Sequence, residues 1–225
     1  MIKIMQNLIK NNERLDDLQC NDLFIIQNPD KYCFTSDAVA LANFAKVKSG
    51  GRLVDLCSGS GVIGILMSAK NNVSQVHLVE IQEYLADMSS RSVQYNKLDG
   101  FFIHNRALQN VHLDIGSGFD TVVCNPPYKK ENTTKDVNPD LDIAIARHEI
   151  KVTLEDIILE ASKLLKFGGE FYIVNKEERL IDMVCYLRKY NLEPKEIKIL
   201  VGGKSANRVM IKAKKGGKSS VKITF

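Results

Sequence analysis

Short apolar runs alternate along this chain with segments that have helical spacing. The runs are rich in Val, Ile and Phe and occupy residues 52–57, 76–80, 101–104, 120–124 and 170–174. Between them, residues 62–69, 82–98 and 153–166 place apolar side chains at the intervals of an amphipathic helix. Because strands joined through helices lie parallel in a sheet covered on both faces, this alternation predicts an α/β fold with a mostly parallel sheet.

The C-terminal part departs from this alternation. Residues 196–201 and 208–213 read as strands joined by a Gly202-Gly203 turn, which predicts an antiparallel pair, and residues 221–225 read as a short final strand. The five parallel strands and this antiparallel pair make seven, so we expect a seven-stranded sheet that is mostly parallel and carries an antiparallel C-terminal strand.

Upstream of the first parallel strand lies a different unit. Residues 23–27 and 31–34 flank an Asn-Pro-Asp turn and predict a hairpin. A helix is expected to follow over 38–46, capped by Ser36 or Asp37. We accordingly divide the chain into an N-terminal hairpin and helix extension, 1–48, and a core with a basic C-terminal hairpin, 49–225.

Composition narrows the class of protein. With 44% hydrophobic and 26% charged residues, the 225-residue chain has the profile of a globular protein with one substantial core. No window approaches eighteen apolar residues and no secretory signal is evident, so we expect a cytoplasmic protein without membrane contact. Its five cysteines are widely spaced and form no C-x-x-C pair, which predicts buried thiols and no metal site. A monomer is favoured over an oligomer.

Positive charge is concentrated near the C-terminus. Residues 195–225 carry nine Lys and Arg against one Glu, a net charge of +8. Such a cluster is typical of a nucleic-acid-binding surface, because phosphates are held mainly by Lys and Arg. A solvated surface with a flexible tail explains the cluster equally well, and the sequence leaves both interpretations open.

A glycine loop follows the first parallel strand. Residues 59–64 form a G-x-G-x-x-G at a strand-to-helix turn, and Glu80 ends the next strand. Glycines allow close approach of a nucleotide, and the carboxylate can accept bonds from ribose hydroxyls, as NAD and S-adenosylmethionine enzymes both require. Asp55, four residues before Gly59, makes the loop resemble the first motif of class I methyltransferases, which have a Rossmann-like fold. The resemblance implies S-adenosylmethionine as cofactor, held by Asp55, Gly59, Gly61 and Glu80, and by Asn125 further along the chain.

The tetrapeptide Asn125-Pro126-Pro127-Tyr128 follows the strand at 120–124 and so lies where ligands of α/β sheets bind. An adenine or amide nitrogen is a poor nucleophile because its lone pair is delocalised. The Asn125 side-chain oxygen and the Pro126 carbonyl can accept both N–H bonds and direct the lone pair at the methyl group. Pro127 fixes the turn, and Tyr128 offers a flat stacking face. Neither a metal nor a covalent enzyme intermediate is needed.

This tetrapeptide is the motif of the amino-methyltransferase branch, whose substrates include adenine in DNA or RNA, cytosine, guanine amines and glutamine side chains. Three further stretches, residues 25–42, 80–82 and 146–149, resemble bacterial transfer-RNA adenine methyltransferases that modify the valine transfer RNA beside its anticodon. The resemblance implies methylation of an exocyclic N6 amine in transfer RNA, with the base turned out of its loop. Methylation of a DNA or ribosomal RNA base, or of a protein glutamine, is the alternative. A catalytically silent RNA-binding module would predict a damaged tetrapeptide.

The same resemblance implies further site residues. Phe34, Thr35 and Asp37 would close over the cofactor or the base. Arg147 and His148 would touch phosphate or base, unless Arg147 forms a structural salt bridge with Asp142 or Glu149. Class I enzymes commonly hold the cofactor adenine through an Asp or Asn after the third strand; here either Asn105 takes that role or the contact is lost.

Overall fold

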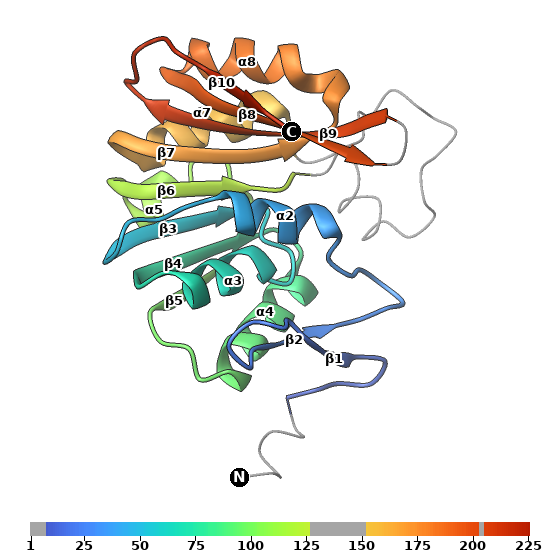
Figure 1. Ribbon diagram of the computed structural model, residues 1–225. Coiled ribbons are helices and arrows are strands. Elements are labelled where there is room, and N and C mark those ends of the chain that lie inside the picture. Colours follow the sequence, from blue (N-terminus) through green and yellow to red (C-terminus); the bar gives the residue numbers. More distant parts are fainter. Residues whose placement is uncertain (1–7, 127–151, 203–204) are drawn as a thin grey trace.

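The computed structural model describes residues 8–126, 152–202 and 205–225. Its centre is one sheet made of β3 (Gly51–Leu56), β4 (Val73–Glu80), β5 (Phe101–Asn105), β6 (Phe119–Cys124), β7 (Leu165–Asn175), β8 (Leu192–Gly202), β9 (Ser205–Lys215) and β10 (Lys222–Thr224). The spatial order is β10-β8-β9-β7-β6-β3-β4-β5 (Figure 1). Strands β3 to β7 pair in parallel, whereas β9 is antiparallel to β7 and β8. The predicted fold class is confirmed, and β10 adds an eighth strand because it pairs with β8 at the sheet edge.

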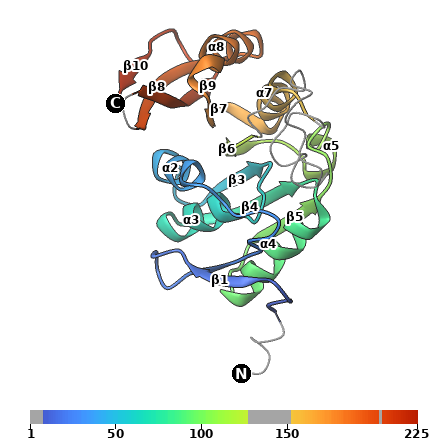
Figure 2. The ribbon, with the colours of Figure 1, turned by 90° about the vertical axis from the view of Figure 1, so that its right-hand side faces the viewer.

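Helices cover both faces of the sheet, and each face is named here after one helix. The α2 face carries α2 (Ser36–Phe44), α3 (Val62–Lys70) and α4 (Glu83–Tyr95). The α7 face carries α5 (His112–Ile115), α7 (Leu154–Leu164) and α8 (Leu180–Lys189), which follows a 3-10 turn at Glu177–Arg179 (Figure 2). Consecutive strand residues point to opposite faces, so Val123 and Tyr172 pack toward α2, whereas Val122 and Phe171 pack toward α7.

Helix α7 begins as the sequence predicts and ends earlier than predicted. The Thr153 hydroxyl accepts the N–H of Asp156 at 3.1 Å, and the Asp156 carboxylate accepts the N–H of Thr153 at 3.0 Å, which is a capping box. The Gly168-Gly169 pair is not the stop, because β7 already starts at Leu165. Lys215 from β9 donates to the carbonyls of Ser162 and Leu165 and thereby satisfies the end of the helix.

The predicted N-terminal hairpin is wrong in its pairing. Strand β2 (Phe24–Gln27) pairs with β1 (Arg14–Asp17), and residues 31–34 contribute only a bridge between Asn28 and Tyr32. Left-handed φ angles at positions 19, 21 and 22 turn the chain back from β1 to β2. The Gln27 side chain accepts the Phe34 N–H at 2.8 Å. This hydrogen bond takes the place of the backbone pairing that a second strand would make. The division at residue 48 stays a prediction.

Helix α2 also begins differently from the expectation. It starts at Ser36 with Thr35 at the N-cap position, and no side chain caps it. Asp37, one of the two expected caps, instead forms an ion pair with Arg208. Cys124 is the one buried cysteine, whereas Cys185 on α8 is exposed, so the expectation of buried thiols holds only in part. Among the described residues, no helix combines the length and apolar character that a membrane span requires.

Candidate functional site

The carboxyl ends of four parallel strands bring half of the predicted site residues to one edge of the sheet. Glu80 pairs with Asn105 across β4 and β5, and Asn125 follows directly after β6, which is paired with β3. The glycine loop leaves β3 between these positions. Helix α2 starts at the same side of the molecule, the side to which the arrowheads of β3 and β6 point (Figure 1).

The glycine loop turns tightly against β4. Gly59 and Gly61 have φ angles of 56° and 84°, in the left-handed region that disfavours side chains. A Cβ on Gly61 would lie 2.9 Å from Leu78 Cδ1, and a Cβ on Gly64 would lie 2.5 Å from Leu78 Cδ2. The glycines at 61 and 64 therefore allow the loop and α3 to pack closely on β4, while Gly59 faces the site.

Glu80 is buried and is held by the backbone of both neighbouring loops. Gly59 donates its N–H to Oε2 at 2.8 Å, and Gln82 donates to Oε1 at 2.9 Å. Burial raises the pKa of this carboxyl, and the backbone N–H bonds, first that of Gln82, oppose the shift. Each carboxylate oxygen has two lone pairs, so each can accept one further bond from a ligand hydroxyl.

Asp55 lies beneath the loop and is fully buried. Its Oδ2 accepts the N–H of Gly64 at 3.1 Å, whereas its Oδ1 has no hydrogen-bond partner among the described residues. Burial raises the pKa of Asp55 to about 8; the Gly64 N–H lowers the pKa and the nearby Glu80 raises it. A positive group placed against Oδ1 would favour the charged carboxylate and lower this pKa again.

Three more buried polar atoms around the loop have no hydrogen-bond partner: Ser58 Oγ, Ser60 Oγ and Gln82 Oε1. Buried polar side chains in native proteins are nearly always hydrogen-bonded. A set of such atoms beside two buried carboxylates fits a polar ligand with hydroxyl and amino groups. The sequence predicted the glycines of this loop but not its serines, because serine is a common residue in any turn.

The Asn105 side-chain amide is hydrogen-bonded within the protein through its nitrogen only. Its Nδ2 donates to the carbonyls of Glu80 at 3.0 Å and Ile81 at 3.1 Å, which leaves Oδ1 as its acceptor atom. Ile81 is an apolar side chain with 38% of its surface exposed at this edge. Together they offer an acceptor and an apolar contact, as an aromatic ring with an amino group requires.

The segment ahead of α2 forms one side of the site. Tyr32 reaches the glycine loop, since a Cβ on Gly59 would lie 3.5 Å from Tyr32 Cε1. Phe34 is tied to Gln27, as described above. At the other end, Arg208 Nε donates to Asp37 Oδ2 at 2.8 Å, which joins this segment to β9. The predicted residues 34, 35 and 37 therefore lie on a segment held at both ends.

The tetrapeptide that starts at Asn125 is described only in its first half. Asn125 is half-buried and Pro126 is buried at the end of β6. Pro127, Tyr128, Arg147 and His148 lie outside the described residues.

A residue that sequence reasoning missed lies next to this turn. Asn175 ends β7, two positions after Ile173, which pairs with Cys124. It is fully buried; its Oδ1 accepts the N–H of Lys176 at 2.8 Å, while its Nδ2 finds no hydrogen-bond partner in the part of the chain that the structure describes. The signal was a polar residue at the carboxyl end of an apolar strand.

Comparison with known proteins decides the family. Residues 35–189 match the family model of the methyltransferase small domain. The chain belongs to this methyltransferase family. The enzyme is 27% identical over 165 residues to the tRNA1(Val) (adenine(37)-N6)-methyltransferase of Porphyromonas gingivalis, covering 70% of this chain and 64% of that relative. It thus spans a little under two thirds of the relative's length.

Solved structures agree on the fold. The methyltransferase is similar to a predicted O-methyltransferase from Agrobacterium tumefaciens, with a TM-score of 0.65, 20% identity, and 83% and 84% of the two chains covered. It is also similar to M. jannaschii TYW2 in complex with AdoMet, with a TM-score of 0.64, 14% identity, and 91% and 86% covered. These likenesses confirm the class I methyltransferase fold. With family membership, they make S-adenosylmethionine the cofactor, and the buried unpartnered atoms fit it.

Proposed function

We propose that this methyltransferase transfers a methyl group from S-adenosylmethionine to the exocyclic N6 amine of an adenine in transfer RNA. The observation that carries the proposal is the position of Asn125 and Pro126 at the end of β6, on the edge that also holds Asp55 and Glu80. The name of the Porphyromonas gingivalis relative supports transfer RNA, and adenine 37 beside the anticodon, as the acceptor. The cytoplasm and a monomer remain our expectations.

The protein's part in the reaction is to shape the acceptor nitrogen. When bound, S-adenosylmethionine supplies an electrophilic methyl group. The Asn125 Oδ1 and the Pro126 carbonyl oxygen accept the two N–H bonds of the adenine amine, which withdraws its lone pair from the ring and aims it at the methyl group. Pro127 and Tyr128 lie outside the described residues; in this proposal the Tyr128 ring would stack on the base.

The cofactor would be held from three sides. Asp55, beneath the loop, orients the methionine end, and its unpartnered Oδ1 suits a cationic amine. Gly59 and Gly61 give close backbone approach, and the two oxygens of Glu80 accept the ribose hydroxyls. The adenine amine of the cofactor would bind Oδ1 of Asn105. Thr35 would close the site from the start of α2.

The acceptor base would enter between the segment ahead of α2 and the tetrapeptide. Phe34 and Asp37 would contact the base or ribose from one side. Arg147 and His148 would contact phosphate or base from the other. Unpaired loop nucleotides cost less to extrude than paired ones, which suits an anticodon loop as the target.

Asn125→Ala tests the assigned role of the tetrapeptide. We expect methyl transfer to fall by about a hundredfold or more, because the reacting nitrogen loses its orienting acceptor. Affinity for S-adenosylmethionine, measured by calorimetry, should stay within about twofold, since Asp55 and Glu80 hold most of the cofactor. Asn72→Ala, an exposed change just before the amino end of β4, is the matched control.

Three acceptors separate the candidate reactions. Wild-type enzyme is incubated with methyl-labelled S-adenosylmethionine and, in separate reactions, unfractionated transfer RNA, duplex DNA and a protein extract. Label in transfer RNA alone supports the proposal. Label confined to DNA or to protein glutamine would support the alternative acceptors, and full activity of Asn125→Ala would contradict the mechanism.

A further inference from the structure

One face of the C-terminal strands is unusually rich in lysine. Residues paired across neighbouring strands point to the same side of a sheet. In β9, Lys214 pairs with Glu170 of β7, and Lys212 pairs with Glu196 of β8. In β10, Lys222 also pairs with Glu196. The register therefore gathers these lysines, together with Lys198 two positions after Glu196, on the α2 face of the sheet. Three carboxylates, those of Glu170, Glu193 and Glu196, lie on the same face.

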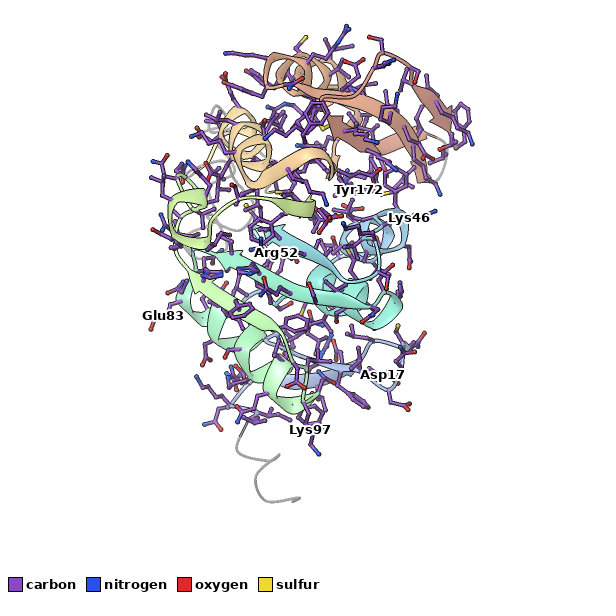
Figure 3. The ribbon with its side chains drawn as sticks, turned by 90° about the vertical axis from the view of Figure 1, so that its left-hand side faces the viewer. Asp17, Lys46, Arg52, Glu83, Lys97 and Tyr172 are labelled. Carbon is purple, nitrogen blue, oxygen red and sulfur yellow. The ribbon has the colours of Figure 1, made fainter. Side chains whose placement is uncertain are left out.

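Helix α2 covers this face only near β7. There it buries Tyr172, Val174 and Met210, whereas the outer strands β8 and β10 extend beyond the helix. Exposed Lys46, just after α2, lies beside Tyr172 (Figure 3), whose hydroxyl donates to Glu170 Oε2 at 2.6 Å. We call Lys46, Lys198, Lys212, Lys214 and Lys222 the basic face.

The basic face differs from the opposite side in how its charges are compensated. Among the residues that the structure describes, Lys212 is bound to Glu170 at 2.8 Å, while the side chains of the other four lysines make no hydrogen bond or ion pair. On the α7 face, by contrast, Lys215 donates to two carbonyls and Lys189 is paired with Glu155. The uncompensated cations are therefore concentrated on one side.

This face is continuous with the rim of the candidate active site. Arg208 pairs with Leu200 of β8 and so lies in the same row of β9 as Lys212 and Lys214. Its ion pair with Asp37 joins that row to the segment ahead of α2. A strand of phosphates bound along β9 would thus lead directly to the place where the acceptor base enters.

We propose that the basic face binds the phosphate backbone of the RNA whose adenine is methylated. The inference rests on the proposed function and extends it by assigning the RNA path. Two other C-terminal lysines do not belong to the basic face. Lys215 binds a carbonyl at the end of α7, and Lys195 binds the 218–220 loop. A competing explanation is that lysines at the edge strand merely prevent sheet-to-sheet association, which requires no contact with RNA.

Neutralisation of three uncompensated lysines tests the assignment. The variant carries Lys198→Gln, Lys214→Gln and Lys222→Gln. Its matched control carries Lys97→Gln, Lys163→Gln and Lys189→Gln, which removes the same charge elsewhere. Binding of labelled unfractionated transfer RNA is measured from about 50 to 200 mM salt, with S-adenosylmethionine present. Thermal melting and cofactor affinity confirm that both variants fold.

The expected result is a weaker, less salt-dependent complex for the basic-face variant alone. The slope of log K against log salt should become less negative by about 2 to 3, since each lost phosphate contact removes roughly 0.7 to 0.9. An unchanged slope, or an equal change in the control, overturns the assignment. If wild type still methylates transfer RNA in that case, the proposed function stands without it. Binding to duplex DNA but not to transfer RNA would overturn both.

Discussion

The surroundings of Asp55 favour a cationic ligand next to its carboxyl group. Its carboxyl group is fully buried, one oxygen has no hydrogen-bond partner, and burial raises its pKa to about 8. The unfolded chain ionises this group near the ordinary value of 3.8. The folded protein therefore holds a proton that the unfolded chain has lost between these two pH values.

The unfolding free energy of the cofactor-free enzyme, measured over a series of pH values, tests the raised pKa of Asp55. Because the folded pKa is raised, the contribution of Asp55 to stability is fully present below about pH 4 and is lost as pH rises toward 8. Wild type should lose unfolding free energy relative to Asp55→Asn between about pH 5 and 8, as measured by urea denaturation. Saturating S-adenosylmethionine should reduce this difference, because a cation at Oδ1 lowers the pKa. If the unfolding free energies of the two proteins changed in parallel with pH, the raised pKa of Asp55 would be contradicted.

Residues whose roles depend on neighbours in sequence could be predicted. Asp55 and Gly59 flank one strand-to-helix turn and Glu80 ends the next strand, so the sequence pattern predicts that they lie together, and the Gly59 N–H does contact Glu80. Arg208 could not be found this way, because its partner Asp37 is 171 positions away. Asn175 is likewise recognisable only from its pairing beside β6.

At the scale of elements, the start of α7 is a local feature with a measurable contribution. Thr153→Ala removes the acceptor of the Asp156 N–H and should lower the free energy of unfolding by about 1 kcal/mol. Thr153→Ser keeps the hydroxyl and should recover most of that loss. Chemical denaturation measures both. Equal losses in the two variants would indicate that the methyl group, and not the cap, stabilises the helix.

The elements themselves were largely readable from the sequence, and the errors have physical causes. The strands of the parallel sheet and the antiparallel pair β8 and β9 follow from apolar periodicity. The end of α7 was misplaced because a lysine from β9 satisfies its last carbonyls. The hairpin partner of β2 was misassigned because the turn at 28–30 is closed by the Gln27 side chain and not by a second strand.

At the scale of the whole molecule, the basic face and the candidate active site follow one another along the surface. The basic face follows β9 to the Asp37 and Arg208 contact, beyond which lie the glycine loop and the turn at Asn125. The sequence revealed the excess of positive charge near the C-terminus but left its meaning open. Strand register was needed to decide which lysines share a surface, because alternate residues of a strand point to opposite faces.

Identification of the methylated nucleoside tests the central claim most directly. Transfer RNA lacking its natural modifications is incubated with the enzyme and S-adenosylmethionine, digested to nucleosides and analysed by mass spectrometry. We predict N6-methyladenosine with wild type and almost none with Asn125→Ala, because the exocyclic amine is the group that the tetrapeptide orients. A methylated guanosine or cytidine, or methyl groups on a ring nitrogen or ribose, would contradict the account.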